Sequence, residues 1–238
     1  MEKCQAIILQ TRKLSDSSKI AIALTDRFGK ISFVAKGAFK SKSKFAGSIQ
    51  ALNQLDIELS IKPNRELQTL TSAEFSSKLS NQFTMEPDLM AAAMIACELV
   101  SKTLPDYEEN KNIFILLKNY LNALEDPIRA FSYLIRFEYK LLLELGFAIN
   151  TEKDPISDSE LLFSNDIGEV GSSGSNTSRI EGYLLKKFFQ ASKSKIKAVD
   201  LPSINNHEAK KITFFVVNYL RYHLDKAFKV HSLHLLEY

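Results

Sequence analysis

The chain contains 238 residues, of which 45% are hydrophobic and 25% are charged, and its formal net charge is only +3. These proportions are ordinary for a globular protein. No apolar run approaches the roughly 18–20 residues that a bilayer-spanning helix needs, and the N-terminus lacks the layout of a secretory signal. We therefore predict a cytoplasmic protein of one or two domains.

The charges are unevenly distributed along the chain. Residues 1–80 contain thirteen Lys and Arg against seven Asp and Glu, which gives +6. Residues 81–200 contain thirteen against eighteen, which gives −5, and residues 201–238 contain five against three, which gives +2. A basic first third and an acidic middle indicate that different parts of the chain have different partners.

Short runs rich in Ile, Leu, Val, Phe and Thr predict β-strands in the first 75 residues. The predicted strands are Gln5–Thr11, Ser18–Thr25, Ile31–Lys36, Leu52–Ile61 and Leu67–Thr71. The sequence between the second and third runs, Asp26 to Lys30, is typical of a hairpin turn, with Gly29 supplying a positive φ. Five short strands in so few residues favour a small closed barrel, because closure removes exposed strand edges.

A strongly basic segment, Arg27 to Lys44, overlaps these strands and contains no Asp or Glu. Cations neutralise phosphates and aromatic faces accept unstacked bases, so this composition favours a nucleic acid as the partner. A lysine-rich solvated surface is the alternative, and Phe33 is expected in the core. The predicted nucleic-acid-binding residues are Arg27, Lys30, Lys36, Lys40, Lys42, Lys44, Phe39 and Phe45.

Helical periodicity replaces the strand pattern after about Glu74. The predicted helices are Asp88–Thr103, Asn110–Leu124, a long helix that opens at Asp126-Pro127 and stops at Gly146, Ile180–Ser192 and Asn206–Leu224. Residues 150–178 contain a Gly- and Ser-rich stretch and are predicted to form a flexible polar loop. We therefore expect two domains, 1–80 and 81–238.

The long central helix carries a second group of basic and aromatic residues, Arg129, Tyr133, Arg136 and Lys140. Their spacing of four, three and four places them on one helix face. A solvated basic face is one interpretation. The other is a binding site for an acidic or C-terminal peptide, because Arg binds carboxylates in a bidentate manner.

No catalytic or cofactor motif is recognisable in the sequence. It contains no phosphate-binding GxxxxGK[ST] or GxGxxG loop, no HExxH and no GxSxG. Its two cysteines, Cys4 and Cys97, are too far apart for a CxxC site, and both are expected to be small buried hydrophobic residues. We predict a protein that is not an enzyme, with no catalytic residues, no cofactor and no metal.

Several short pieces of the sequence occur in an order that is typical of one protein family. Two lie in or next to the basic segment, from Phe28 to Lys40 and at Lys42-Ser-Lys-Phe45 with Gly47. Others are Ala6–Leu9, Ser17–Ile20, Thr25–Gly29, Leu52–Leu59, Leu70–Glu74, Arg136–Glu138, Leu141-Leu142, Leu145–Phe147 and Arg221–Leu224. As an ordered set, these pieces resemble the RecO family of bacterial recombination mediators, and the resemblance covers nearly the whole chain.

The resemblance implies an α+β protein with an N-terminal five-stranded OB-fold barrel and an all-α helical domain. It also implies DNA repair activity by binding single- and double-stranded DNA, annealing complementary strands and acting with RecR on DNA coated by single-strand-binding protein. A cytoplasmic, nucleoid-associated location follows. The family's DNA-binding residues would fall on Lys30, Lys36, Lys40, Lys42 and Lys44. Its contact with the tail of single-strand-binding protein would fall near Arg129, Arg136 and Lys140.

The sequence departs from the family pattern in one place. Many members have two CxxC pairs after the Leu-Gly-Phe element, whereas residues 150–178 contain no cysteine. The zinc-finger module therefore lacks its ligands, and we expect a loose loop in its place. A protein-interaction adaptor with an incidental barrel and an RNA-binding OB protein are the alternative functions.

Overall fold

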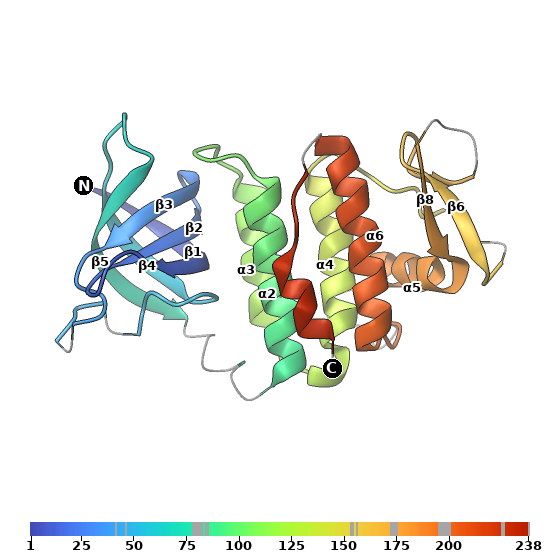
Figure 1. Cartoon of the computed structure of the whole chain (residues 1–238), viewed down its shortest axis with the longest axis horizontal. Coiled ribbons are helices and arrows are strands. Elements are labelled where there is room, and N and C mark those ends of the chain that lie inside the picture. Colours follow the sequence, from blue (N-terminus) through green and yellow to red (C-terminus); the bar gives the residue numbers. More distant parts are fainter. Residues whose placement is uncertain are drawn as a thin grey trace. The chain divides into compact units, whose positions relative to one another are not determined.

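The structure is a computed structural model that describes residues 1–40, 42–45, 47–77, 83, 86–152, 155, 157–171, 176–194, 201–224 and 227–237. The chain forms two compact units, Met1–Asn122 and Ala123–Tyr238, and Figure 1 labels most of its helices and strands. No helix in the described ranges is long and apolar enough to cross a membrane.

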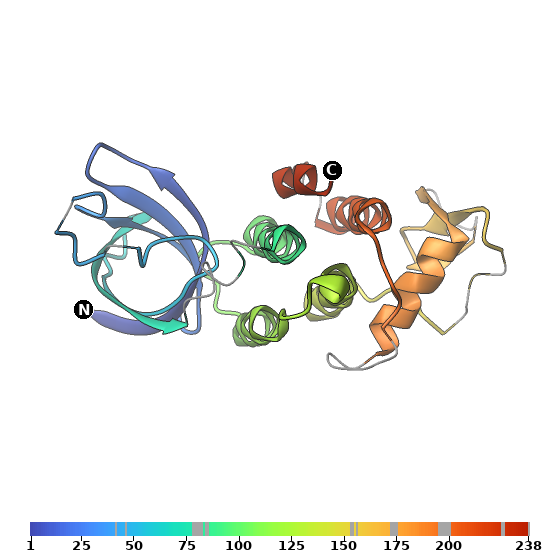
Figure 2. The same ribbon diagram turned by 90° about the horizontal axis from the view of Figure 1, so that it is seen from below.

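The first unit is built on a closed barrel of five strands. They are β1 (Glu2–Lys13), β2 (Lys19–Thr25), β3 (Gly29–Ala35), β4 (Gln54–Ser60) and β5 (Leu67–Ser77). They follow one another round the barrel in the order β1-β2-β3-β5-β4, and β4 pairs with β1 to close it. All neighbours are antiparallel except β3 and β5, which pair in parallel. Figure 2 shows the strands curving round a common interior, and the predicted OB-type barrel is confirmed.

Strand alternation places small and branched side chains inside this barrel. Cys4, Ala6 and Ile8 of β1 point inward, and Phe33 of β3 is fully buried among them. Further buried core residues come from β2, β3, β4 and β5 in the same alternating pattern, and Phe45 and Ile49 join them from the loop between β3 and β4. Burial raises the pKa of the Cys4 thiol to about 12, so Cys4 and the fully buried Cys97 are the inert core residues that we expected.

The β2–β3 hairpin depends on Gly29 for two separate reasons. Its φ is +64°, a conformation that favours glycine. A Cβ atom at this position would also lie 1.9 Å from the backbone oxygen of Glu108. Thr25 fixes the turn, because its hydroxyl accepts a hydrogen bond from the Phe28 amide at 2.9 Å and donates one to the Gly29 carbonyl at 2.9 Å.

Among the described residues, the first unit also contains two helices, α2 (Pro87–Thr103) and α3 (Lys111–Ala123). The connection between them pairs with the barrel, since the Tyr107 amide donates to the Lys30 carbonyl at 2.9 Å. From α3, Lys118 donates to the Gln5 side chain at 3.0 Å. The compact unit therefore continues well past residue 80, where we predicted a boundary; residues 78–82 themselves lie outside the described ranges.

The second unit contains three long helices, α4 (Ala130–Glu144), α5 (Gly182–Lys193) and α6 (Asn206–Leu224). Two short 3-10 segments, η1 (Pro127–Arg129) and η2 (His231–Leu236), accompany them. The Asp126 side chain accepts a hydrogen bond from the Ile128 amide and caps η1, as its position before Pro127 predicted. Gly146, with a φ of +83°, follows the last turn of α4.

A small three-stranded sheet lies where the sequence predicted a flexible loop and an all-α domain. Its strands are β6 (Glu160–Ser164), β7 (Glu169–Val170) and β8 (Thr177–Glu181), in the order β7-β6-β8. The prediction of a flexible polar loop is wrong for these strands; residues 153–154, 156 and 172–175 lie outside the described part. The prediction rested on the polar average composition of residues 150–178 and overlooked Phe163. This residue is fully buried, and its ring contacts the ring of Phe215 on α6, with a centroid distance of 5.0 Å.

Between α4 and α6 the second unit buries a carboxyl group, that of Glu138. Its side chain accepts a hydrogen bond from the Thr213 hydroxyl at 2.7 Å, and the residue is 0% exposed. Burial raises the pKa of Glu138 from 4.5 to about 8, although the Thr213 hydrogen bond lowers it. The folded protein therefore keeps this carboxyl protonated at neutral pH.

Replacing Glu138 with Gln is expected to change how stability depends on pH. The unfolded chain releases the Glu138 proton near pH 4.5, whereas the folded state holds it up to about pH 8. Between these two pH values the free energy of unfolding therefore falls by about 1.4 kcal/mol per pH unit. Glu138→Gln carries no titrating group, and its stability should decline less. Urea unfolding at pH 5, 6.5 and 8 measures the difference, and Glu144→Gln, on the exposed end of α4, is the control. Parallel pH profiles for wild type and Glu138→Gln would contradict the assignment.

Candidate nucleic-acid interface

A basic hollow of about 540 Å³ lies on the outside of the barrel. Two segments form its walls: the turn between β1 and β2, and the segment that leads from the end of β3 into the β3–β4 loop. Its lining residues are Leu14, Ser17, Ser18, Val34, Lys36, Gly37, Lys40, Lys42, Ser43 and Lys44. Four lysines thus converge on one depression, and no Asp or Glu is among the described residues that line it.

Strand parity explains why these lysines face outward. Phe33 and Ala35 point into the core, so Val34 and Lys36 point to the opposite side of β3. Gly37, with a φ of +77°, then turns the chain so that the Lys40 amide donates to the Gly37 carbonyl at 3.0 Å. The loop therefore returns its lysines to the mouth of the same hollow.

Most of these ammonium groups are free to meet an anion. Lys36, Lys40 and Lys42 are exposed, and their ammonium groups have no hydrogen bond or ion pair with any described residue. Lys44 is partly committed, because it donates to the Thr71 carbonyl and lies 5.1 Å from the centre of the Phe45 ring. The hollow thus concentrates positive charge that the described part of the protein does not neutralise.

Lys19, at the start of β2, holds the basic loop against the barrel. Its ammonium donates to the Ile49 carbonyl at 3.0 Å and lies 5.1 Å from the centre of the Phe39 ring. The Phe39 amide also donates to the Ser17 carbonyl at 3.1 Å. One lysine therefore links both ends of the loop, and a backbone hydrogen bond joins the two walls of the hollow.

The two predicted stacking residues have different environments. The Phe39 side chain is 47% exposed and remains available to an unstacked base. Phe45 is only 2% exposed and packs in the barrel core with Phe33 and Ile49. A stacking role for Phe45 is wrong for this structure, because a base could reach the ring only if the barrel opened.

Two of the predicted basic residues do not line the hollow. Lys30 donates to the Ser101 carbonyl at 2.7 Å and lies 3.2 Å from an Asp106 carboxylate oxygen, with only 14% of its side chain exposed. Arg27 donates to the Lys3 carbonyl at 2.7 Å. It lines a second hollow, of about 340 Å³, together with Asp26, Asp56, Glu58 and Glu74, among others. These positions attract a polyanion less than the lysine hollow does.

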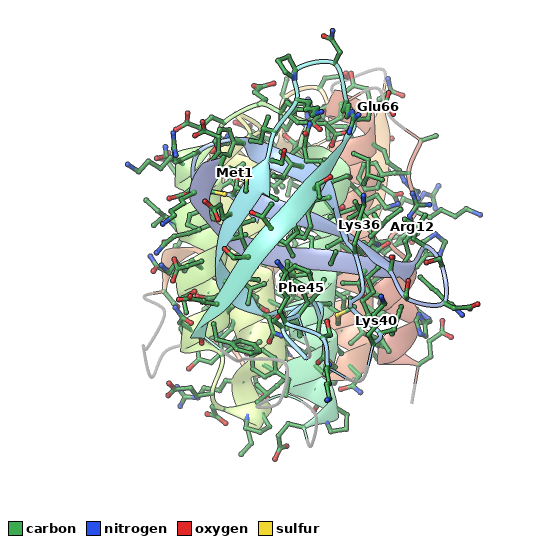
Figure 3. All side chains as sticks on the ribbon, turned by 90° about the vertical axis from the view of Figure 1, so that its left-hand side faces the viewer. Met1, Arg12, Lys36, Lys40, Phe45 and Glu66 are labelled. Atoms are coloured by element: carbon green, nitrogen blue, oxygen red, sulfur yellow. The ribbon has the colours of Figure 1, made fainter. Side chains whose placement is uncertain are left out.

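The structure also brings together residues that the sequence analysis missed. Figure 3 shows Arg12, Lys36 and Lys40 on the same side of the barrel, away from Met1. β1 extends to Lys13, beyond the predicted end at Thr11. Arg12 of β1 pairs with Ile20 of β2, and Ile20 pairs in turn with Val34 of β3, so the three residues lie in one row across the strands. Continuing the alternation through Arg12 would have found it. Ser17 and Ser18 belong to one of the pieces that carry the family resemblance, but no sequence pattern indicated a binding role for them, because that role depends on the fold of the turn.

The predicted peptide-binding face of α4 is partly engaged within its own unit. Arg136 donates to the Ser194 carbonyl, and partial burial lowers the pKa of its guanidinium. Arg129 lies 3.6 Å from a carboxylate oxygen of Asp126. Tyr133 and Lys140 are half-buried, and the Lys140 ammonium lies 5.6 Å from the centre of the Tyr139 ring.

Comparison with known proteins places both parts of the chain in one family. Residues 1–78 match the family model described as Recombination protein O N terminal. Residues 86–232 match the model described as Recombination protein O C terminal. Together, the two matches cover most of the chain.

Individual relatives agree with these matches. The chain is 34% identical over 142 residues to the DNA repair protein RecO of Symbiobacterium thermophilum, covering 59% of this chain and 55% of that one. It is 33% identical to the protein of that name from Chlorobium limicola, covering 61% and 56%. The chain thus spans about half the length of these two relatives. A match of 26% identity to the RecO of Caldanaerobacter subterraneus covers 95% and 94%.

Replacing Lys19 with Met is expected to loosen the basic loop without unfolding the barrel. The change removes a charged hydrogen bond and a cation–π contact, together worth about 2 kcal/mol. Since about 1.4 kcal/mol corresponds to a factor of ten, hydrogen exchange at the Phe39 amide should accelerate by up to about thirtyfold, while exchange in β1 and β4 should not change. The control is Lys13→Met, which removes only an exposed ion pair with Asp16. Equal acceleration in both variants would show that Lys19 does not hold the loop.

Proposed function

The chain belongs to the RecO family, and on that basis we propose that it is a recombination mediator in DNA repair. It binds single- and double-stranded DNA, anneals complementary strands and acts with RecR on DNA coated by single-strand-binding protein. It works without chemistry of its own, and we assign it no catalytic residue and no cofactor.

The observation that carries this proposal is the convergence of four lysines on one hollow of the barrel. Annealing requires that the repulsion between the phosphates of two strands be neutralised while their bases stay accessible. A hollow lined by Lys36, Lys40, Lys42 and Lys44 supplies the first condition. The second condition is met because lysines contact the phosphates and make few base-specific contacts, which leaves the bases accessible. The exposed ring of Phe39 also offers a face on which a base can stack.

The remaining parts of the proposal concern the partners and the location of the protein. Arg129, Tyr133, Arg136 and Lys140 form the proposed site for the tail of single-strand-binding protein, although Arg136 already donates to the Ser194 carbonyl. RecR is the proposed protein partner in loading. A cytoplasmic, nucleoid-associated location follows from DNA binding. Matched RNA and DNA oligonucleotides would separate this function from that of an RNA-binding OB protein.

Reversing the charge of Lys40, Lys42 and Lys44 to Glu is expected to weaken binding of a single-stranded oligonucleotide about a hundredfold at low salt. All three side chains point away from the core, so the fold should survive. Four phosphate contacts predict a wild-type slope of log K against log salt of about −2.8, at ~0.7 per contact, and the variant should show a much flatter slope.

The control keeps the same change in net charge but moves it elsewhere. Lys62→Glu, Lys111→Glu and Lys229→Glu replace three exposed lysines outside the hollow. This control variant should retain most of the affinity. Both variants should also be compared in annealing of complementary strands coated with single-strand-binding protein. Unchanged DNA binding by the first variant would overturn the assignment of the hollow.

Alanine at Arg129 and Lys140 is expected to weaken binding of a fluorescent peptide that carries the acidic tail of single-strand-binding protein. Each change removes a cation from the proposed peptide site, so we expect a loss of about tenfold for the pair. Fluorescence anisotropy measures the peptide, and oligonucleotide binding by the same variant should not change. Lys186→Ala with Lys193→Ala, on α5, is the control. Tail affinity that equals wild type would remove this face from the proposal.

A further inference from the structure

We propose that the basic hollow is a defined phosphate-binding pocket, in which the hydroxyl groups of Ser17 and Ser18 donate hydrogen bonds to one backbone phosphate. This inference rests on the proposed function and deepens it. It assigns ligand roles to the β1–β2 turn, which lies outside the basic segment of the sequence. It also distinguishes a built site from a diffuse positive surface.

The position of the two serines supports this role. Ser17 and Ser18 line the hollow opposite Lys36, Lys40 and Lys42, so a phosphate drawn in by the ammonium groups arrives within the same depression. Both residues are half-buried. A group at the wall of a pocket is better placed to meet a specific phosphate oxygen than a group on a convex surface.

The serine hydroxyls are also uncommitted. Each has only the other as a hydrogen-bond partner among the described residues, at an Oγ–Oγ separation of 3.5 Å. That separation is too long for a strong hydrogen bond between hydroxyls. Ser43, the third serine in the lining, is different, because its Oγ already accepts a hydrogen bond from the Phe45 amide at 3.1 Å. Ser17 and Ser18 therefore keep their donor capacity for a ligand.

The walls of the pocket are fixed before any ligand enters. The Phe39 amide joins the loop to the Ser17 carbonyl, and Lys19 holds the loop at both ends. Within the turn, the Leu14 amide donates to the Ser18 carbonyl at 2.9 Å. Such preorganisation reduces the entropy lost on binding, so the hydroxyls gain more from each hydrogen bond than mobile side chains would.

The chemistry of the pocket suits a tetrahedral oxyanion with several acceptor oxygens. Lysine ammonium groups act as point charges and do not orient a phosphate, whereas hydroxyl donors at fixed positions do. The hollow is open, which allows a phosphate within a continuing strand to enter. Both a nucleic-acid phosphate and free inorganic phosphate share this chemistry, and the test separates them.

The test compares Ser17→Ala/Ser18→Ala with wild type in binding of a single-stranded oligonucleotide across a range of salt concentrations. The variant keeps every lysine, so we expect about tenfold weaker binding with the same salt slope. Ser17→Thr/Ser18→Thr keeps both hydroxyls and should bind within about threefold of wild type. Ser72→Ala, which lies in the second hollow, should bind as wild type does. Thermal unfolding of each variant verifies that the barrel remains folded.

A second arm identifies the group that is bound. An oligonucleotide with uncharged methylphosphonate linkages should bind both proteins more weakly, and the difference between wild type and the double Ala variant should shrink, because a hydrogen bond to an uncharged phosphoryl oxygen is weaker than one to a charged phosphate. Inorganic phosphate should compete with the oligonucleotide only at millimolar concentrations. Competition at micromolar concentrations would indicate a site for the free ion and would overturn the assignment to a strand.

The outcomes separate this inference from the proposed function. Normal binding by Ser17→Ala/Ser18→Ala, together with the loss on reversal of Lys40, Lys42 and Lys44, would overturn the pocket and leave DNA binding in place. Normal binding by both variants would overturn both. A reduced salt slope in the double Ala variant would show that the change had displaced lysines, and would also count against the hydroxyl contacts.

Discussion

The burial of Phe45 is the contact on which the basic surface of the barrel depends. The loop between β3 and β4 carries several lysines whose mutual repulsion opposes a compact arrangement. Phe45 inserts its ring into the core, at 2% exposure, and so anchors the middle of this loop. The Ser48 amide and hydroxyl both donate to the Phe45 carbonyl, at 3.2 and 3.1 Å. One buried ring therefore holds charged neighbours in place on the outer face.

The basic residues of this segment divide into two groups with different roles. Lys30 and Arg27 bind carbonyl groups and carboxylates of the same unit, and they stabilise the barrel and its junction with α2. Lys36, Lys40 and Lys42 keep their charge for a ligand. Lys30 is largely buried, and Arg27 is exposed but paired with the Lys3 carbonyl and a Glu2 carboxylate, so net charge along the sequence overestimates the size of the binding surface.

The second unit obtains its order from apolar burial where the sequence pattern is most polar. Phe163 packs against Phe215 and Tyr219 of α6, with a centroid distance of 5.9 Å to the latter. Gly168 reverses the chain between β6 and β7 at a φ of +66°, in a position where a Cβ would lie 2.9 Å from the Ala148 carbonyl oxygen. A buried aromatic residue and a tight turn, together with the buried Ile180 of β8, thus help to order a three-stranded sheet in a segment without cysteines.

The sequence by itself determined the barrel, the long helices and most of the candidate DNA-binding residues. Alternation in β4 and the Gly29 turn follow local rules, because side chains alternate along any strand and a positive φ favours glycine. Only the tertiary structure decided which of the predicted residues act together. In the folded protein Phe45 is buried in the core, and Lys30 donates to a carbonyl of α2. Ser17 and Ser18 line the same hollow as the lysines. These outcomes depend on contacts between residues far apart in the chain, which local patterns do not encode.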